Sequence, residues 1–153
     1  MTSSDVYRHN HDNSSYDVVF TVSNYWDGPR EGIANYEGQP HYYRCVFNEN
    51  KDEWSDSFIL KPVDPETLEL ALEDWQIWLR WEAAYREGRV ALDSHPALPE
   101  DRQRQETIAA ILSERIVIDP QTDMKAEAEF EAVPGDDRSY PHRNWRVRWF
   151  PTT

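Results

Sequence analysis

Two segments near the C-terminal end of the chain alternate between apolar and charged residues, and this period constrains the fold more than any other feature. The segments are residues 124–133, MKAEAEFEAV, and residues 144–150, NWRVRWF. A period of two is typical of a β-strand with one buried face, whereas a helix repeats every ~3.6 residues. If the segments pair antiparallel, small alanines lie beside tryptophans, and glutamates face Arg146 and Arg148. The sequence therefore predicts a closing hairpin with residues 134–143 as its loop.

The N-terminal part of the chain carries the signals of further strands. Residues 16–26, YDVVFTVSNYW, are rich in β-branched and aromatic residues, and the Asp-Gly-Pro that follows must turn the chain. Residues 32–36 and 41–47 flank Glu-Gly-Gln-Pro, a connection of suitable length for a longer hairpin loop. A fourth strand is expected at residues 57–62.

A long helix is expected after these strands, from about residue 65 to residue 87. Asp64 can cap its free amides, Pro65 suits the first helical position, and Gly88 supplies a stop. Apolar residues recur at helical spacing in two stripes. We expect the first stripe to be core, and it consists of Leu68, Leu72, Trp75 and Leu79. The second stripe consists of Leu70, Ile77, Trp81 and Tyr85. The second stripe would cover a shorter helix, predicted at residues 99–115, or bury a partner.

The element order ββββααββ predicts an α+β fold, in which an antiparallel sheet of about six strands packs with one long and one shorter helix. A small open barrel and a flat, helix-backed sheet both fit this order. A chain of 153 residues suits one domain. We expect that domain at residues 16–153, after a mobile polar tail at residues 1–15 that has few apolar residues to bury.

Charge and composition argue against several classes of function. The formal net charge of −13 repels a phosphate backbone, so we expect no nucleic-acid partner. No apolar run approaches the roughly 18 residues of a membrane span. Cys45 is the single cysteine, and no apolar signal stretch stands near the N-terminus, so a cytoplasmic location is expected. We expect no cofactor and no metal site, since His9, His11 and Asp12 lack a scaffold that would fix coordination geometry.

Acidic residues are concentrated between residues 49 and 74, where nine Asp and Glu stand against two Lys. A solvated face that aids solubility is one interpretation, and a docking surface for a basic protein partner is the other. Such charge more often serves solubility. Among specific functions we place docking first, and this role includes an antagonist or immunity-type protein that holds a basic toxin. The candidate partner-binding residues are Glu49, Asp52, Glu53, Asp56, Glu66, Glu69 and Glu73.

Two alternatives to protein docking remain. Asp27, Arg30, His41 and Tyr43 could form a small-molecule or catalytic pocket if turns gather them at one end of the sheet, with His41 exchanging protons and Arg30 holding an anionic group. The same four residues could instead form a structural latch of hydrogen bonds. Because no catalytic motif is present, we lean against an enzyme. The other alternative is a structural homodimer through the tryptophan-rich helix.

Overall fold

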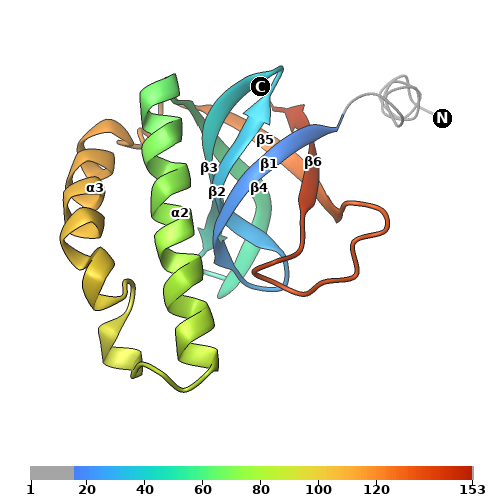
Figure 1. Cartoon of the computed structure of the whole chain (residues 1–153). Coiled ribbons are helices and arrows are strands. Elements are labelled where there is room, and N and C mark those ends of the chain that lie inside the picture. The colour runs from blue at the N-terminus through green and yellow to red at the C-terminus, as the bar shows by residue number, and fades with distance from the viewer. Residues whose placement is uncertain (1–15, 153) are drawn as a thin grey trace.

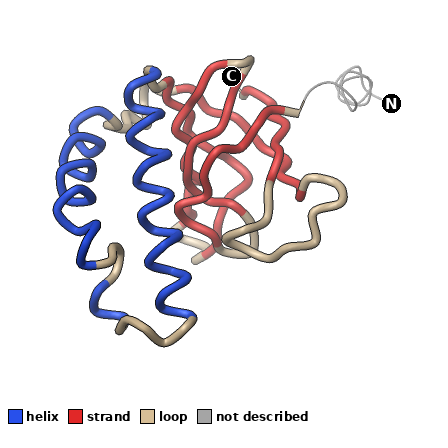
Figure 2. Tube along the Cα trace, in the orientation of Figure 1, coloured by secondary structure: helices blue, strands red, loops and turns tan. Residues whose placement is uncertain are grey.

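The computed structural model describes residues 16–152, so the predicted tail at residues 1–15 lies outside the described residues. Its elements follow the predicted order (Figures 1 and 2). They are β1 (Asp17–Tyr25), β2 (Pro29–Tyr36), β3 (Gln39–Asn48), β4 (Glu53–Pro62), α2 (Pro65–Arg86), α3 (Arg102–Arg115), β5 (Met124–Ala132) and β6 (Trp145–Pro151). Two short 3-10 turns, Leu92–Ser94 and Pro99–Asp101, connect the helices. Within residues 16–152, no helix has both the length and the apolar character needed to cross a membrane.

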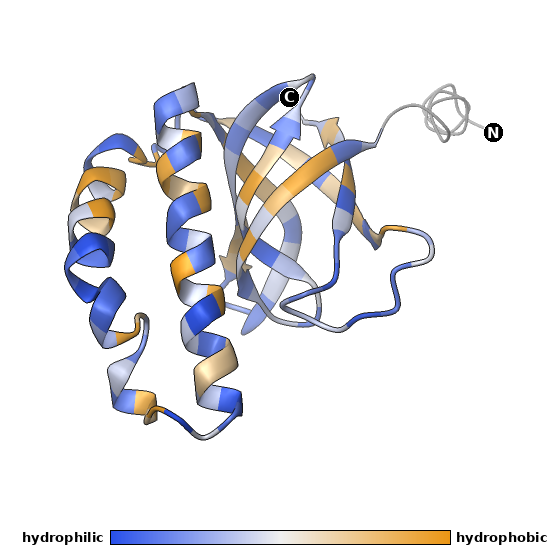
Figure 3. Cartoon of the chain, viewed as in Figure 1, coloured by the Kyte–Doolittle hydropathy of each residue, from blue (hydrophilic) through white to orange (hydrophobic). Residues whose placement is uncertain are grey.

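The six strands form a closed antiparallel barrel in which each strand pairs with its neighbours in sequence order. Asp17 and Val18 of β1 pair with Val147 and Arg146 of β6, and this short ladder closes the barrel. The prediction of an α+β fold with a small barrel is thus confirmed, and the barrel is closed rather than open. Figure 3 shows hydrophobic residues along β1 and hydrophilic ones along the loop between β5 and β6.

The closing hairpin of β5 and β6 forms as the alternation predicts. Ala128 pairs with Trp149 on the inner face, while Glu129 pairs with Arg148 and Glu131 with Arg146. Arg148 donates to Glu129 at 2.7 Å, and Arg146 Nε donates to Glu131 at 2.9 Å. The period of two thus overrides the helix propensity of alanine and glutamate.

The barrel core is aromatic and centred on Tyr43 of β3. The rings of Phe58, Phe130 and Trp149 lie 5.3 to 6.1 Å from the Tyr43 ring. The hydroxyl of this fully buried tyrosine donates to the carbonyl of Thr21 at 2.9 Å. A buried hydroxyl needs such a partner, because leaving it unpaired would cost free energy.

The two helices form a hairpin that stands outside the barrel (Figure 1). Asp64 caps α2 by accepting from the Thr67 amide at 2.7 Å, as predicted. The second apolar stripe of α2 covers the shorter helix and the helical connection, because Ile77 packs with Ile108 and Trp81 with Leu98. The first stripe is only partly buried at all four of its positions, so the prediction that it forms the helix core is wrong: Leu68, Leu72, Trp75 and Leu79.

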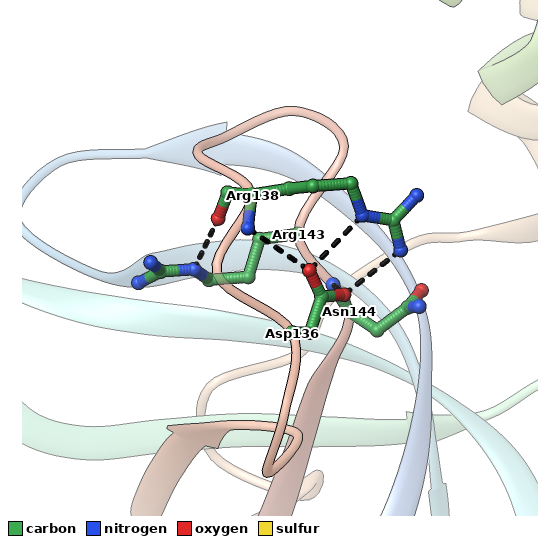
Figure 4. Close-up of polar contacts among 4 residues, drawn as sticks. All are labelled: Asp136, Arg138, Arg143 and Asn144. Carbon is green, nitrogen blue, oxygen red and sulfur yellow. Dashed lines mark hydrogen bonds and ion pairs between the residues drawn. The ribbon is translucent and has the colours of Figure 1, made fainter.

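The loop between β5 and β6, residues 133–144, is fixed by one carboxylate (Figure 4). Asp136 accepts hydrogen bonds from the backbone and side chain of Arg138 and from the Asn144 amide, at 2.8 to 3.1 Å. Its side chain is 9% exposed. The loop also carries Tyr140, whose ring stacks on Tyr25 at 4.6 Å.

These donors hold the pKa of Asp136 well below its ordinary value, with the Arg138 side chain as the largest cause. A lowered folded-state pKa stabilises the fold above the unfolded value of about 4, and the contribution is lost as the pH falls through the folded value. We expect Asp136→Asn to lower the melting temperature by a few degrees at pH 7 and by progressively less toward pH 2.

Thermal melts monitored by circular dichroism across this pH range would measure the effect. Asp137→Asn is the matched control, because Asp137 is exposed and the donors of Arg138 and Asn144 bond Asp136 instead. A deficit for Asp136→Asn that is equally large at pH 2 and pH 7 would contradict the assignment.

Candidate functional site

The structure does not gather Asp27, Arg30, His41 and Tyr43 at one end of the sheet. Asp27 and Arg30 lie at the turn between β1 and β2, whereas His41 pairs with Ala34 toward the opposite end of β2. Tyr43 lies between them in the barrel interior. The predicted shared site therefore divides into a turn, a core tyrosine and a histidine at the far end.

Arg30 holds the β1–β2 turn and covers a tryptophan. Its Nε donates to the Trp26 carbonyl at 2.8 Å, and a terminal nitrogen lies 3.5 Å from the Asp27 carbonyl. The guanidinium lies over the Trp54 ring, 5.4 Å from its centroid. These contacts occupy Arg30 within the chain.

His41 and Tyr43 share the inner face, and their polar atoms have partners inside the chain, as a latch requires. His41 Nδ1 lies 2.8 Å from the Gln39 carbonyl, and Tyr43 bonds Thr21. These partners are backbone carbonyls, so the four residues do not form the predicted latch with one another. Cys45, on the same face, is buried, and burial raises the pKa of its thiol.

The end of the barrel that carries Asp27 is the first candidate site, and we call it the hairpin end. It comprises the β1–β2 turn, the β3–β4 turn and the loop between β5 and β6. A hollow of about 310 Å³ opens here between Asp27, Asp56 and Trp145. Trp26 is 68% exposed at the β1–β2 turn, and Phe47 is 40% exposed on β3.

The seven candidate acidic residues divide between two places. Glu49, Asp52, Glu53 and Asp56 are exposed on the β3–β4 hairpin, at or beside the hairpin end. Glu66, Glu69 and Glu73 lie in the first half of α2. Within the helical hairpin, Glu66 bonds Arg115 at 3.1 Å and Glu73 bonds Arg104 at 2.6 Å. The helical acids are therefore partly neutralised by α3, while the hairpin acids make no ion pair with any residue in the range 16–152.

A second candidate site is a cavity of about 530 Å³ between the outside of the barrel and the helical hairpin. We call it the interlayer cleft. Its barrel wall includes Glu31, Tyr42 and Arg44, and its helical wall includes Asp74 and Trp75. Sequence reasoning missed it, although strand alternation does place Tyr42 and Arg44 on the outer face, opposite to Tyr43.

No protein-family model, curated protein or solved structure matches the chain significantly. Among residues 16–152, no group of three His, Cys, Asp or Glu side chains is arranged to hold a metal ion.

Proposed function

We propose that the protein is an acidic interaction domain that docks a basic protein partner through its hairpin end. The observation that carries the proposal is the exposure of Trp26 at the same end of the barrel as exposed, unneutralised carboxylates. A large aromatic side chain that stays in water contributes binding energy when a partner covers it. Acidic groups around such an anchor favour a basic partner and speed its association.

The hollow at the hairpin end suits one basic side chain of that partner. Asp27 and Asp56 line it together with the aromatic rings of Tyr25, Phe58 and Trp145. Arg30 also lines the hollow, and its guanidinium lies over the Trp54 ring. A lysine or arginine that enters would meet carboxylates at its charged end and rings along its aliphatic stem. The proposal includes an antagonist that binds a basic toxin. It also includes a cytoplasmic location, which is supported by the presence of a single cysteine, Cys45.

The test is affinity capture from native lysate, followed by titration of the purified captured protein by isothermal calorimetry. We expect a basic protein whose affinity falls at least tenfold between 50 mM and 500 mM NaCl, because salt screens exposed charges. Trp26→Ala should weaken binding at least tenfold. The triple variant Glu49→Gln, Asp52→Asn, Asp56→Asn should do the same at low salt and remove most of the salt dependence.

A matched triple variant of the helical acids, Glu66→Gln, Glu69→Gln, Glu73→Gln, is the control. It removes the same formal charge from the other part of the acidic segment, and we expect it to keep wild-type affinity. Equal losses for the two triple variants would show that net charge alone drives association. Unchanged binding for Trp26→Ala would overturn the docking site.

The tryptophan helix offers less surface for the homodimer alternative. Trp81 is 4% exposed and bonds Ser94 at 2.8 Å, while Trp75 and Trp78 line the interlayer cleft. Tyr85 is the one aromatic residue of α2 that is exposed. We therefore favour docking at the hairpin end over a dimer through α2.

A further inference from the structure

The interlayer cleft is a second site, separate from the hairpin end, with the size of a small-molecule pocket. Its volume of about 530 Å³ lies within the range of roughly 300 to 1,000 Å³ that ligand pockets occupy. Strands β1, β2 and β3 supply one wall, and α2 and α3 supply the other. Figure 1 shows the helical hairpin standing beside these strands.

The polar groups on the barrel wall neutralise one another. Tyr42 donates a short hydrogen bond from its hydroxyl to Glu31. Arg44 donates to the Tyr42 hydroxyl at 3.1 Å and lies 3.9 Å from the Glu31 carboxylate. The Arg44 cation, the Glu31 carboxylate and the Tyr42 hydroxyl therefore bond one another, and the charges of Arg44 and Glu31 balance.

The helical wall carries a carboxylate without a cation. Asp74 is half-buried in the cleft, where the Gln105 side chain is its hydrogen-bond partner. It makes no ion pair with any residue that the structure describes. Burial is the largest cause of the raised pKa of Asp74. A carboxylate in this position gains from a cation, because desolvation disfavours its charged form until a positive charge compensates it.

An aromatic surface lies beside this carboxylate and begins at Trp75, the next residue of α2 after Asp74. The rings of Trp75 and Trp78 stack at 5.2 Å, and Trp78 in turn contacts Tyr140 at 6.0 Å. Trp75 ends this series, since no other ring or guanidinium within the described residues contacts it. Leu112 and Ile116 add apolar surface from the α3 side.

We propose that the interlayer cleft binds a small organic cation, an amine carried on an aromatic or apolar body. The ammonium group pairs with Asp74, and the body lies against Trp75 and the apolar side chains of the α3 wall. Tryptophan is the aromatic residue that best attracts a cation to its face, and a nearby carboxylate adds charge pairing in a partly desolvated site. An anionic ligand would instead bring a second negative charge to Asp74.

Three indole ligands of similar shape and different charge test the proposal: tryptamine, the neutral alcohol tryptophol, and indole-3-propionate. Isothermal calorimetry with the full chain at pH 7.5 would give the affinities. We expect tryptamine to bind at least tenfold more tightly than tryptophol, and indole-3-propionate to bind more weakly still. Asp74→Asn should remove the advantage of the amine, whereas Trp75→Leu should weaken the amine and the alcohol alike.

Two further variants make the test specific to the cleft. Glu69→Gln removes an exposed charge from the same helix outside the cleft and should leave the tryptamine affinity unchanged. Arg44→Gln removes the cation from the opposite wall and should strengthen tryptamine binding. No tryptamine binding at millimolar concentration, equal affinities for the three ligands, or an unchanged preference in Asp74→Asn would each overturn the proposal. If Asp74→Asn does not fold, the ligand series and Arg44→Gln still test whether the cleft binds an organic cation. None of these outcomes bears on docking at the hairpin end.

Discussion

Gly32→Ala should lower the free energy of unfolding by about 3 kcal/mol, the upper end of the usual cost of overpacking. Gly32 lies on β2 opposite Val22 of β1, at an irregular part of that ladder. A Cβ atom added there would lie 2.8 Å from both the Thr21 carbonyl carbon and the Tyr43 hydroxyl oxygen, and closer still to the Thr21 carbonyl oxygen. The backbone of β1 and the central core tyrosine would both have to move.

Urea denaturation monitored by tryptophan fluorescence would measure this loss. Gly38→Ala is the matched control, because its Cβ would meet nothing within 4 Å and only the left-handed backbone, at φ +79°, opposes it. We expect that control to cost about 1 kcal/mol. Adding Tyr43→Phe to Gly32→Ala should recover little, since the Thr21 carbonyl still blocks the Cβ. A cost for Gly32→Ala no larger than that of the control would show that the strands separate there without penalty.

The elements that sequence predicts well are those whose evidence is local. The alternation in β5 and β6 fixes which residues share a face, and opposite charges fix how the strands pair. The start of α2 is equally local, since the Asp64 cap and Pro65 act within one turn. Closure of the barrel is different, because the pairing of β1 with β6 joins residues more than a hundred positions apart.

The prediction of a shared site for Asp27 and His41 failed for a reason that sequence could have revealed. In a meander, the turns before and after one strand lie at opposite ends of that strand. From Arg30 to Ala34, the partner of His41, β2 rises roughly 13 Å at about 3.3 Å per residue. Strand order alone therefore separates the two turns.

The interlayer cleft could not be predicted in this way. Trp75 and Tyr42 lie on opposite walls of the cleft. Trp75 follows the helical spacing of apolar residues and Tyr42 the strand alternation, and both patterns are equally compatible with a closed core. Ile77 and Trp81, on the other stripe of α2, pack against α3 and the helical connection, while Trp75 lines the cleft. Which of two apolar stripes meets which neighbour is a property of long-range packing.

Ile108→Ala should unfold the helical hairpin before the barrel. Ile108 is fully buried between Ile77 and Ala97, and truncating such a side chain costs roughly 2 to 5 kcal/mol. The barrel has its own cluster of buried residues, which shares no member with the helical clusters. The loss should therefore fall on the local opening of α2 and α3, in the manner of a separate cooperative unit.

Native-state hydrogen exchange would measure this opening residue by residue. In Ile108→Ala we expect the amides of α2 and α3 to exchange at least thirtyfold faster, which corresponds to the lower limit of about 2 kcal/mol. The amides around Leu60 on β4 should keep their protection. Leu60→Ala is the counterpart in the barrel core, where the side chain is 1% exposed, and it should lower protection in the strands. If Ile108→Ala lowers protection equally in strands and helices, the barrel and the helical hairpin unfold as one unit, and the local opening that we infer does not occur.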